Sequence, residues 1–314
     1  MKVVALAGGV GGAKLVDGLA ELLSPDEFCV IVNTGDDFKH LSLHISPDLD
    51  TVCYTLAGIA NPETGWGLRG DSFVTLQALD DLGGDSWFQI GDRDLATHIL
   101  RTTRLSRGET LSEITSDFCR QWGILHPVYP MSNEPVHTFV HTACGETLAF
   151  QEYFVHQKFQ PVVRSFEYKG AENAFPIKGA MKKLKDCDLV IIAPSNPWVS
   201  IAPILAIPGY HEAMLNKTVI AISPLIGGKA MKGPAAKICA ELGFQPCAAA
   251  VADYYRDLIT GFAFDTVDRD QLEIIQRWAI IPLVTSIIMK DKKDRVRLAN
   301  EVLKFCTLVL NRSL

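Results

Sequence analysis

The chain has 314 residues, of which 48% are hydrophobic and 21% are charged. This composition excludes a disordered or low-complexity protein. Lys and Arg number 30 against 36 Asp and Glu, giving a net charge of −6, and this acidic balance argues against nucleic acid as a partner. The longest apolar stretches, 201–208 and 278–289, are shorter than the roughly 18–20 residues that span a bilayer. We therefore expect no membrane partner.

The N-terminal apolar run and the cysteines both favour a cytoplasmic location. The run Val3–Ala7 is too short for the apolar region of an export signal and has no cleavage site after it. The eight cysteines are scattered, without a CxxC motif or a Cys/His cluster. We expect reduced, mostly buried thiols and no zinc site.

The first elements in chain order predict a doubly wound sheet. Residues 2–7 form an apolar run that ends at glycines, which is typical of a buried parallel strand. Residues 12–23 have helical spacing, and residues 28–32 are a second apolar run. A strand, a glycine loop, a helix and a second strand in this order begin a Rossmann-like fold.

The stretch that follows reads as a helical insertion. Residues 50–60, 72–82, 94–105 and 110–122 are predicted helices, separated by turn signals such as Gly83-Gly84 and Arg107-Gly108. No linker composition marks a boundary. We therefore predict a single α/β domain over 1–314, with a helical insertion at 47–125 inside it.

Sheet signals return after this insertion. Residues 136–141 and 147–155 are predicted strands, and the turn 143–146 between them suits a short β-hairpin. Further on we predict helices at 174–184, 229–242 and 291–310 and buried strands at 189–193 and 218–222. The predicted fold class is α/β, a Rossmann-like, mostly parallel sheet with a helical insertion and a short hairpin.

Four loops at predicted strand ends carry the chemistry. Ligands of open α/β sheets bind beyond the carboxyl ends of the strands. Turn chemistry alone explains any one of these loops, but it explains all four together poorly. They are small, polar, acidic or glycine-rich, and they span residues 8–14, 33–37, 194–197 and 223–229.

The first loop favours a phosphate-bearing ligand. Glycines Gly9, Gly11 and Gly12 allow close approach of the backbone, the next helix offers free N–H groups, and Lys14 adds a positive charge. It is not a Walker A loop, because Leu15 stands where Ser or Thr is needed. A nicotinamide site is disfavoured because Lys14 replaces the third glycine and Asn33 ends the second strand instead of an acidic residue.

Acidic residues near this loop favour a divalent cation. Asp36 and Asp37 follow the second strand, and Asp48 and Asp50 lie at the next helix start. Asp48 alone can be explained as a helix cap, whereas Asp50 cannot. Carboxylates that face a phosphate repel it unless Mg²⁺ bridges the two. The simpler interpretation is a solvated acidic turn.

Other polar residues leave alternatives open. Arg93, between Asp92 and Asp94, suits either a local ion-pair cap or a fork for a phosphate or a heterocycle edge. His98 reads as packed rather than catalytic, and the aromatics of Phe150–Phe154 read as core residues on a strand. Ser195 lacks the G-x-S-x-G elbow of a serine hydrolase.

Taken together, these motifs resemble the 2-phospho-L-lactate transferase family of coenzyme F420 biosynthesis. The resemblance runs from the first strand to at least Pro234, nearly the whole chain. It rests on the stretches 8–15, 33–37, 47–58, 91–98, 150–155, 193–197 and 223–234.

The resemblance implies a reaction. The family moves a phospholactyl-type group from lactyl-diphospho-guanosine, or from its enolpyruvyl analogue, to the ribityl hydroxyl of the deazaflavin precursor FO, and GMP leaves. It also implies Mg²⁺ as cofactor and a possible homodimer. The three-carbon acid of the donor (lactate, enolpyruvate or glycerate) depends on pocket shape.

The resemblance also implies residue roles. Asp50, the catalytic candidate, and Arg93 match positions that contact FO, and Asp36 and Asp50 match metal-side carboxylates. Ser195, Asn196, Gly228 and Lys229 would lie near the guanine nucleotide. One departure stands out, because His156 and Gln157 precede Lys158 where basic residues are expected.

Two other functions remain as alternatives. A non-enzymatic nucleotide- or nucleotide-sugar-binding regulator of the same superfamily would share the glycine loop and the acidic turn, but not the motifs at 91–98 and 150–155. A nicotinamide oxidoreductase is the weaker alternative, for the reasons given at Lys14 and Asn33.

Overall fold

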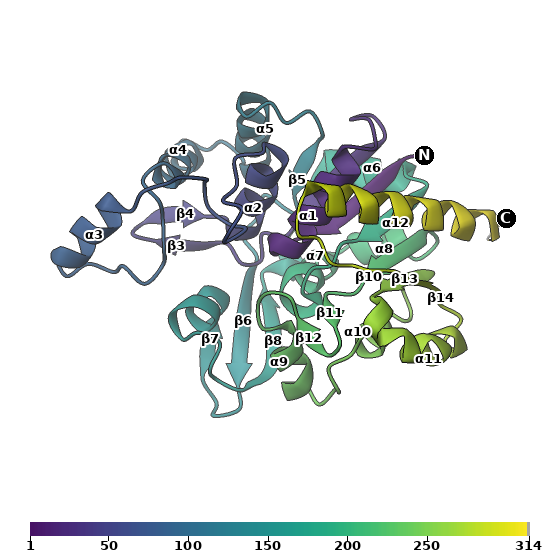
Figure 1. The fold of residues 1–314 in the computed structure, drawn as a ribbon. Helices are drawn as coiled ribbons and strands as arrows, with labels where there is room; N and C mark the ends of the chain where they lie inside the picture. The colour runs from purple at the N-terminus through teal and green to yellow at the C-terminus, as the bar shows by residue number, and fades with distance from the viewer. Residues whose placement is uncertain (313–314) are drawn as a thin grey trace.

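A parallel sheet with helices on both faces forms the centre of the protein (Figure 1). The computed structural model describes residues 1–312. The strand order in the sheet is β14-β13-β10-β9-β1-β2-β5, and all of its pairs are parallel. The predicted Rossmann-like α/β class is confirmed. The strands are β1 (Val3–Ala7), β2 (Phe28–Val32), β5 (Val128–Pro130), β9 (Leu189–Ile192), β10 (Thr218–Ile222), β13 (Gly261–Phe264) and β14 (Ile281–Val284).

Apolar side chains cover both faces of the sheet, which is why β1, β2, β9 and β10 read as continuous apolar runs. One face packs on α1 (Gly9–Ala20), α2 (Pro47–Leu56) and the long C-terminal α12 (Lys292–Arg312). In Figure 1 α12 lies across α1. The opposite face packs mainly on α6 (Lys178–Asp186), α8 (Tyr210–Met214), α10 (Ala248–Tyr254) and α11 (Leu272–Arg277).

Four helices lie between β4 and β5, as predicted for the insertion. They are α2, α3 (Val74–Asp81), α4 (Asp94–Ser106) and α5 (Leu111–Gln121), and α3 and α4 extend away from the sheet in Figure 1. The sequence analysis missed the small hairpin of β3 (Phe38–His40) and β4 (Leu43–Ile45) before them. Its turn residues, Leu41 and Ser42, have positive φ angles of 51° and 64°. Hairpin turns of this kind normally carry Asn or Gly, so this one has no sequence signal.

A second sheet contains β6 (His137–Thr142), β7 (Thr147–Ala149) and β8 (Val163–Lys169). The predicted hairpin of β6 and β7 is confirmed, whereas β8 was missed. The prediction of a strand through residue 155 was wrong, because Glu152–His156 is a π-helix. Aromatic residues favour strands in isolation. Here the helical turn buries Phe150 and Tyr153 on one side, so packing overrides the local preference.

The prediction of a helix from residue 229 was also wrong in its first half. Lys229–Ala230 (β12) pairs with Leu225–Ile226 (β11), and the helix α9 is limited to Ala235–Glu241. Gly233 has a positive φ of 72° and Pro234 follows it, so the helix starts only after them. The remaining short helices are Ala171–Asn173, Pro197–Ile201, α7 (Ala202–Leu205) and Thr266–Gln271.

Among the described residues, no helix has the length and apolar character needed to cross a membrane.

Candidate functional site

The order in which the chain adds strands to the sheet reverses at β1, and a large cavity lies beside the loop that follows this strand. The chain runs from β1 to β2 on one side and later returns to β9 on the other side. Ligands of open α/β sheets bind at such a switch point. The loops after these two strands meet directly, because Ser195 Oγ accepts from the Gly8 N–H at 3.0 Å and donates to the Gly8 carbonyl at 2.7 Å. A cavity of about 850 Å³ lies against these loops.

The glycine loop forms the floor of this cavity, at the start of α1. A side chain at Gly11 would place Cβ 2.5 Å from the Pro194 carbonyl oxygen, and one at Gly8 would place it 2.2 Å from Asp48 Oδ2. The loop therefore packs too tightly for any larger residue. The N-terminus of α1 lines the cavity, so the positive end of its helix dipole suits a phosphate there.

A buried acidic pair lies beside the glycine loop. The amide Nδ2 of Asn33 donates to Asp36 Oδ1 at 3.3 Å and to Asp48 Oδ2 at 2.9 Å. Burial and the nearby Asp48 charge raise the pKa of Asp36 well above its ordinary value. Burial also raises the pKa of Asp48 to about 6. Both carboxylates line the cavity and lack a positive partner among residues 1–312, so a cation there would relieve their repulsion.

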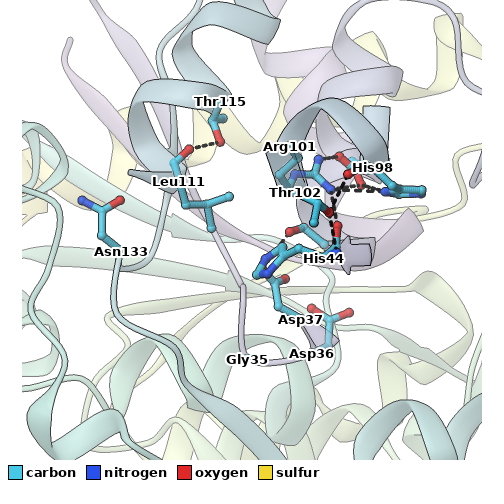
Figure 2. A network of polar contacts seen from close by, with 12 residues as sticks. Gly35, Asp36, Asp37, His44, His98, Arg101, Thr102, Leu111, Thr115 and Asn133 are labelled. Carbon is cyan, nitrogen blue, oxygen red and sulfur yellow. Dashed lines mark hydrogen bonds and ion pairs between the residues drawn. The ribbon is translucent and has the colours of Figure 1, made fainter. Parts of the chain in front are cut away.

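Asp50 faces the cavity and forms a buried ion pair. Arg101 of α4 donates from Nη1 to Asp50 Oδ2 at 3.0 Å and from Nη2 to Oδ1, a bidentate contact. Burial opposes the charge on Arg101, but the Asp50 carboxylate outweighs it and raises the pKa of the guanidinium. His98 lies next to Arg101 (Figure 2), with Nδ1 3.8 Å from Asp50 Oδ2 and Nε2 3.5 Å from Asp94 Oδ1. This network holds Asp50 in one orientation.

One wall of the cavity is aromatic and the other end is basic. Lys14 donates to the Met289 carbonyl at 2.9 Å, and burial together with the charges of Arg295 and Lys232 lowers its pKa. Asn196 also lines the cavity, and its buried Nδ2 has no hydrogen-bond partner among the described residues. The aromatic wall suits a flat ring system, and the basic end suits an anion. The aromatic residues of the wall are Trp87, Phe88, Phe150, Phe154 and Phe159.

The structure places the sequence-predicted residues in two groups. Those that line the cavity are Gly9, Gly11, Lys14, Asp36, Asp50, Ser195 and Asn196. Those that lie outside its lining are Gly12, Arg93, Gly228 and Lys229. The Arg93 side chain is exposed, and its Nη1 donates to the Arg69 carbonyl at 3.2 Å. Gly12 packs against Ser195 Oγ, 2.4 Å from where its Cβ would lie.

Sequence reasoning missed several residues that complete the site. Asp48 was explained as a helix cap, yet it is buried on the cavity wall. His98 is packed as predicted, and it also lines the cavity. Gln151 donates to Asp36 Oδ2 at 3.2 Å from the segment that was read as a strand. Asp48 gave a signal as one of the acidic residues near the glycine loop. Asn33 gave another, because a polar residue at the carboxyl end of a buried strand points at the ligand crevice.

No group of three or more His, Cys, Asp or Glu side chains within residues 1–312 is arranged to hold a metal by itself. Asp36 and Asp48 are two carboxylates, and Asp50 is engaged by Arg101. Mg²⁺ commonly binds one or two carboxylates and takes its other ligands from water and substrate phosphates. The Asp36–Asp48 pair therefore fits such a shared site, whereas a site made only of protein ligands is absent here.

Acidification is expected to stabilise the metal-free protein. An ordinary Asp side chain has a pKa of 3.8. In the fold the pKa of Asp48 rises to about 6, and the pKa of Asp36 also rises. Between these pKa values the folded chain binds more protons than the unfolded chain, so the free energy of unfolding increases as pH falls. The melting temperature in chelator should rise from pH 7.5 to pH 5 more steeply in the wild type than in Asp48→Asn. Equal slopes in the two proteins would contradict this assignment.

The fold and the site define a class, an α/β protein with a glycine loop, an acidic pair and an aromatic wall around one cavity. The family described as 2-phospho-L-lactate transferase CofD matches residues 3–275. The chain belongs to this family, as the resemblance in the sequence had indicated.

Curated relatives match over nearly the whole chain. A 2-phospho-L-lactate transferase of Methanopyrus kandleri is 41% identical over 308 residues, covering 97% of each chain. A phosphoenolpyruvate transferase of Streptomyces coelicolor is 38% identical, covering 96% of this chain and 97% of its own. A UPF0052 family protein of Bacillus halodurans has a similar solved structure, with a TM-score of 0.64 and 15% identity, covering 96% of this chain and 98% of its own. That likeness supports the fold alone.

Proposed function

We propose that this protein transfers a 2-phospholactyl or phosphoenolpyruvyl group from lactyl- or enolpyruvyl-diphospho-guanosine to the ribityl hydroxyl of FO, releasing GMP. The observation that carries the proposal is full-length similarity to proteins named 2-phospho-L-lactate transferase and phosphoenolpyruvate transferase. The regulator alternative lacks comparable support, because these full-length relatives are named as transferases. The proposed place of the reaction is the step of coenzyme F420 biosynthesis that joins these two substrates.

The cavity offers a separate region to each substrate. We assign the diphosphate of the donor to the glycine loop, Lys14 and the N-terminus of α1, all at the basic end. The Nδ2 of Asn196, which has no partner within residues 1–312, can donate to the nucleotide. The aromatic wall can stack on the deazaflavin ring of FO. Gly228 and Lys229 lie outside the lining, so we give them no direct contact.

Charge neutralisation and positioning account for the chemistry. The ribityl oxygen attacks the phosphorus that bears the three-carbon acid, and the bond from this phosphorus to the bridging oxygen of the GMP phosphate breaks. GMP leaves with the electron pair of that bond, and the proton lost by the hydroxyl passes to the leaving phosphate. Each Asp50 oxygen keeps a lone pair beyond its bond to Arg101, so Asp50 can accept a hydrogen bond from the attacking hydroxyl. Asp36 and Asp48 would hold Mg²⁺, which supplies positive charge to the diphosphate in the transition state.

Two further properties remain predictions. A homodimer is consistent with exposed apolar side chains gathered on and beside α3 and α4, namely Phe73, Val74, Leu82, Ile99 and Leu100. A cytoplasmic location is consistent with cysteines that are free throughout the described residues and mostly buried.

A product analysis tests the proposed function. Purified protein, FO, Mg²⁺ and an equal mixture of the lactyl, enolpyruvyl and glyceryl donors should release GMP and an equal amount of a phosphorylated deazaflavin. Mass spectrometry of the product then identifies the acid, because the three products differ in mass. Absence of both GMP and a phosphorylated deazaflavin, with the protein folded by circular dichroism, would contradict the proposal.

A further inference from the structure

Two loops meet across the mouth of the cavity through a lysine. Lys232 lies between β12 and α9, and its ammonium donates to the Glu63 carbonyl at 3.4 Å and to the Thr64 carbonyl. These carbonyls belong to the loop 61–67, which follows α2. Both loops contribute to the cavity lining, with Thr64 and Trp66 on one side and Met231 and Lys232 on the other.

The loop 61–67 rests on the glycine loop itself. Gly65 has a positive φ of 79°, and a Cβ there would lie 2.5 Å from Val10 Cγ1. Val10 is part of the glycine loop that we assign to the diphosphate. A movement of loop 61–67 would therefore uncover the floor of the cavity, and the contacts of Lys232 keep the loop in place.

The charge of Lys232 is directed at the same end of the cavity. It contributes to the lowered pKa of Lys14, so the two ammonium groups are close enough to repel each other. Neither has a carboxylate partner in the described part of the chain, where the lysine ion pairs are those of Lys237 and Lys292. Two uncompensated positive charges beside a helix N-terminus form a site for a multiply charged anion.

We propose that Lys232 fastens loop 61–67 over the bound donor and donates its third N–H to the donor diphosphate. An ammonium has three donors and no acceptor. Two of these donors are used by the loop carbonyls, which leaves one for the ligand. The charge of the donor thereby stabilises the closed mouth, and the closed mouth excludes water from the phosphorus under attack. The identity of the donor rests on the proposed function, whereas the contact with a nucleoside diphosphate does not.

Binding of GDP with Mg²⁺ is the direct test, measured by isothermal titration calorimetry. Lys232→Ala should weaken GDP binding about tenfold to a hundredfold, the usual range for a lost charge-assisted hydrogen bond. Lys217→Ala is the matched control, because Lys217 also donates to two carbonyls, those of Lys185 and Cys187, each at 2.9 Å, but lies away from the cavity. It should leave GDP affinity within about twofold of the wild type. Equal affinities in Lys232→Ala and Lys217→Ala would overturn the proposal.

Limited proteolysis measures whether loop 61–67 is closed over the cavity. GDP should protect loop 61–67 from cleavage in the wild type and in Lys217→Ala, but not in Lys232→Ala at saturating GDP. Kinetics separate this result from the proposed function. If the wild type is active, Lys232→Ala should raise KM for the donor and leave KM for FO unchanged. If the wild type is inactive with FO and donor, the proposed function fails, while calorimetry still decides the role of Lys232.

Discussion

Asp50→Asn is expected to lower the free energy of unfolding by about 3–5 kcal/mol, since it leaves a buried Arg101 charge without its partner. Both Asp50 oxygens bond to Arg101, and both side chains are buried. The variant should also lose most of its turnover, because the carboxylate to which we assign the ribityl hydroxyl is gone. Urea unfolding measures the first effect, and GMP release measures the second.

A double variant separates these two effects. Asp50→Asn combined with Arg101→Gln removes both charges, so most of the lost stability should return. Turnover should stay low, because neither neutral side chain replaces the carboxylate. Recovery of near-normal turnover in the double variant would remove Asp50 from the mechanism and leave it a structural role only.

Asp48→Asn is expected to reduce kcat about a hundredfold or more, the usual cost of removing one charge-stabilising group from a reacting site. The Asp48 carboxylate lies against Gly8, and its partner Asn33 links it to Asp36. With one carboxylate left, the Mg²⁺ concentration that gives half-maximal activity should also rise. A titration of rate against Mg²⁺ measures both changes.

The effect on stability distinguishes Asp48→Asn from Asp50→Asn. Asp48 has a raised pKa and no arginine partner, so its neutral replacement should keep or increase the melting temperature. The exposed Asp257→Asn serves as the control for a lost negative charge. An unchanged Mg²⁺ dependence in Asp48→Asn would exclude Asp48 from the proposed metal site.

The central sheet was predictable because its inner strands are continuous apolar runs, and the convergence of their loops follows from parallel topology. β1, β2, β9 and β10 lie where the sequence indicated. The strands β13 and β14 were missed, since each has only four residues and β14 contains Pro282. The insertion was predictable too, because its segments have helical spacing and turn signals lie between them.

The site was predictable at its strand ends and at the starts of α1 and α2, but not where distant segments contribute. Asp36 and Ser195 follow strands, and the structure brings them to the cavity as expected. Arg101 reaches Asp50 from 51 positions away, and no local pattern marks such a partner. Lys232 lies in the loop that was read as a helix, so its place at the cavity mouth depended on Gly233 and Pro234.

The central claim is that a metal-bound diphosphate and the ribityl alcohol of FO meet in this one cavity. A crystal structure with GDP, FO and Mn²⁺ in place of Mg²⁺ tests it most directly, because an anomalous difference map locates the metal without assumptions. We expect the Mn²⁺ peak between the Asp36 and Asp48 carboxylates and the diphosphate on the glycine loop, with the ribityl chain reaching Asp50. A metal peak elsewhere, or FO bound outside the cavity, would contradict the account.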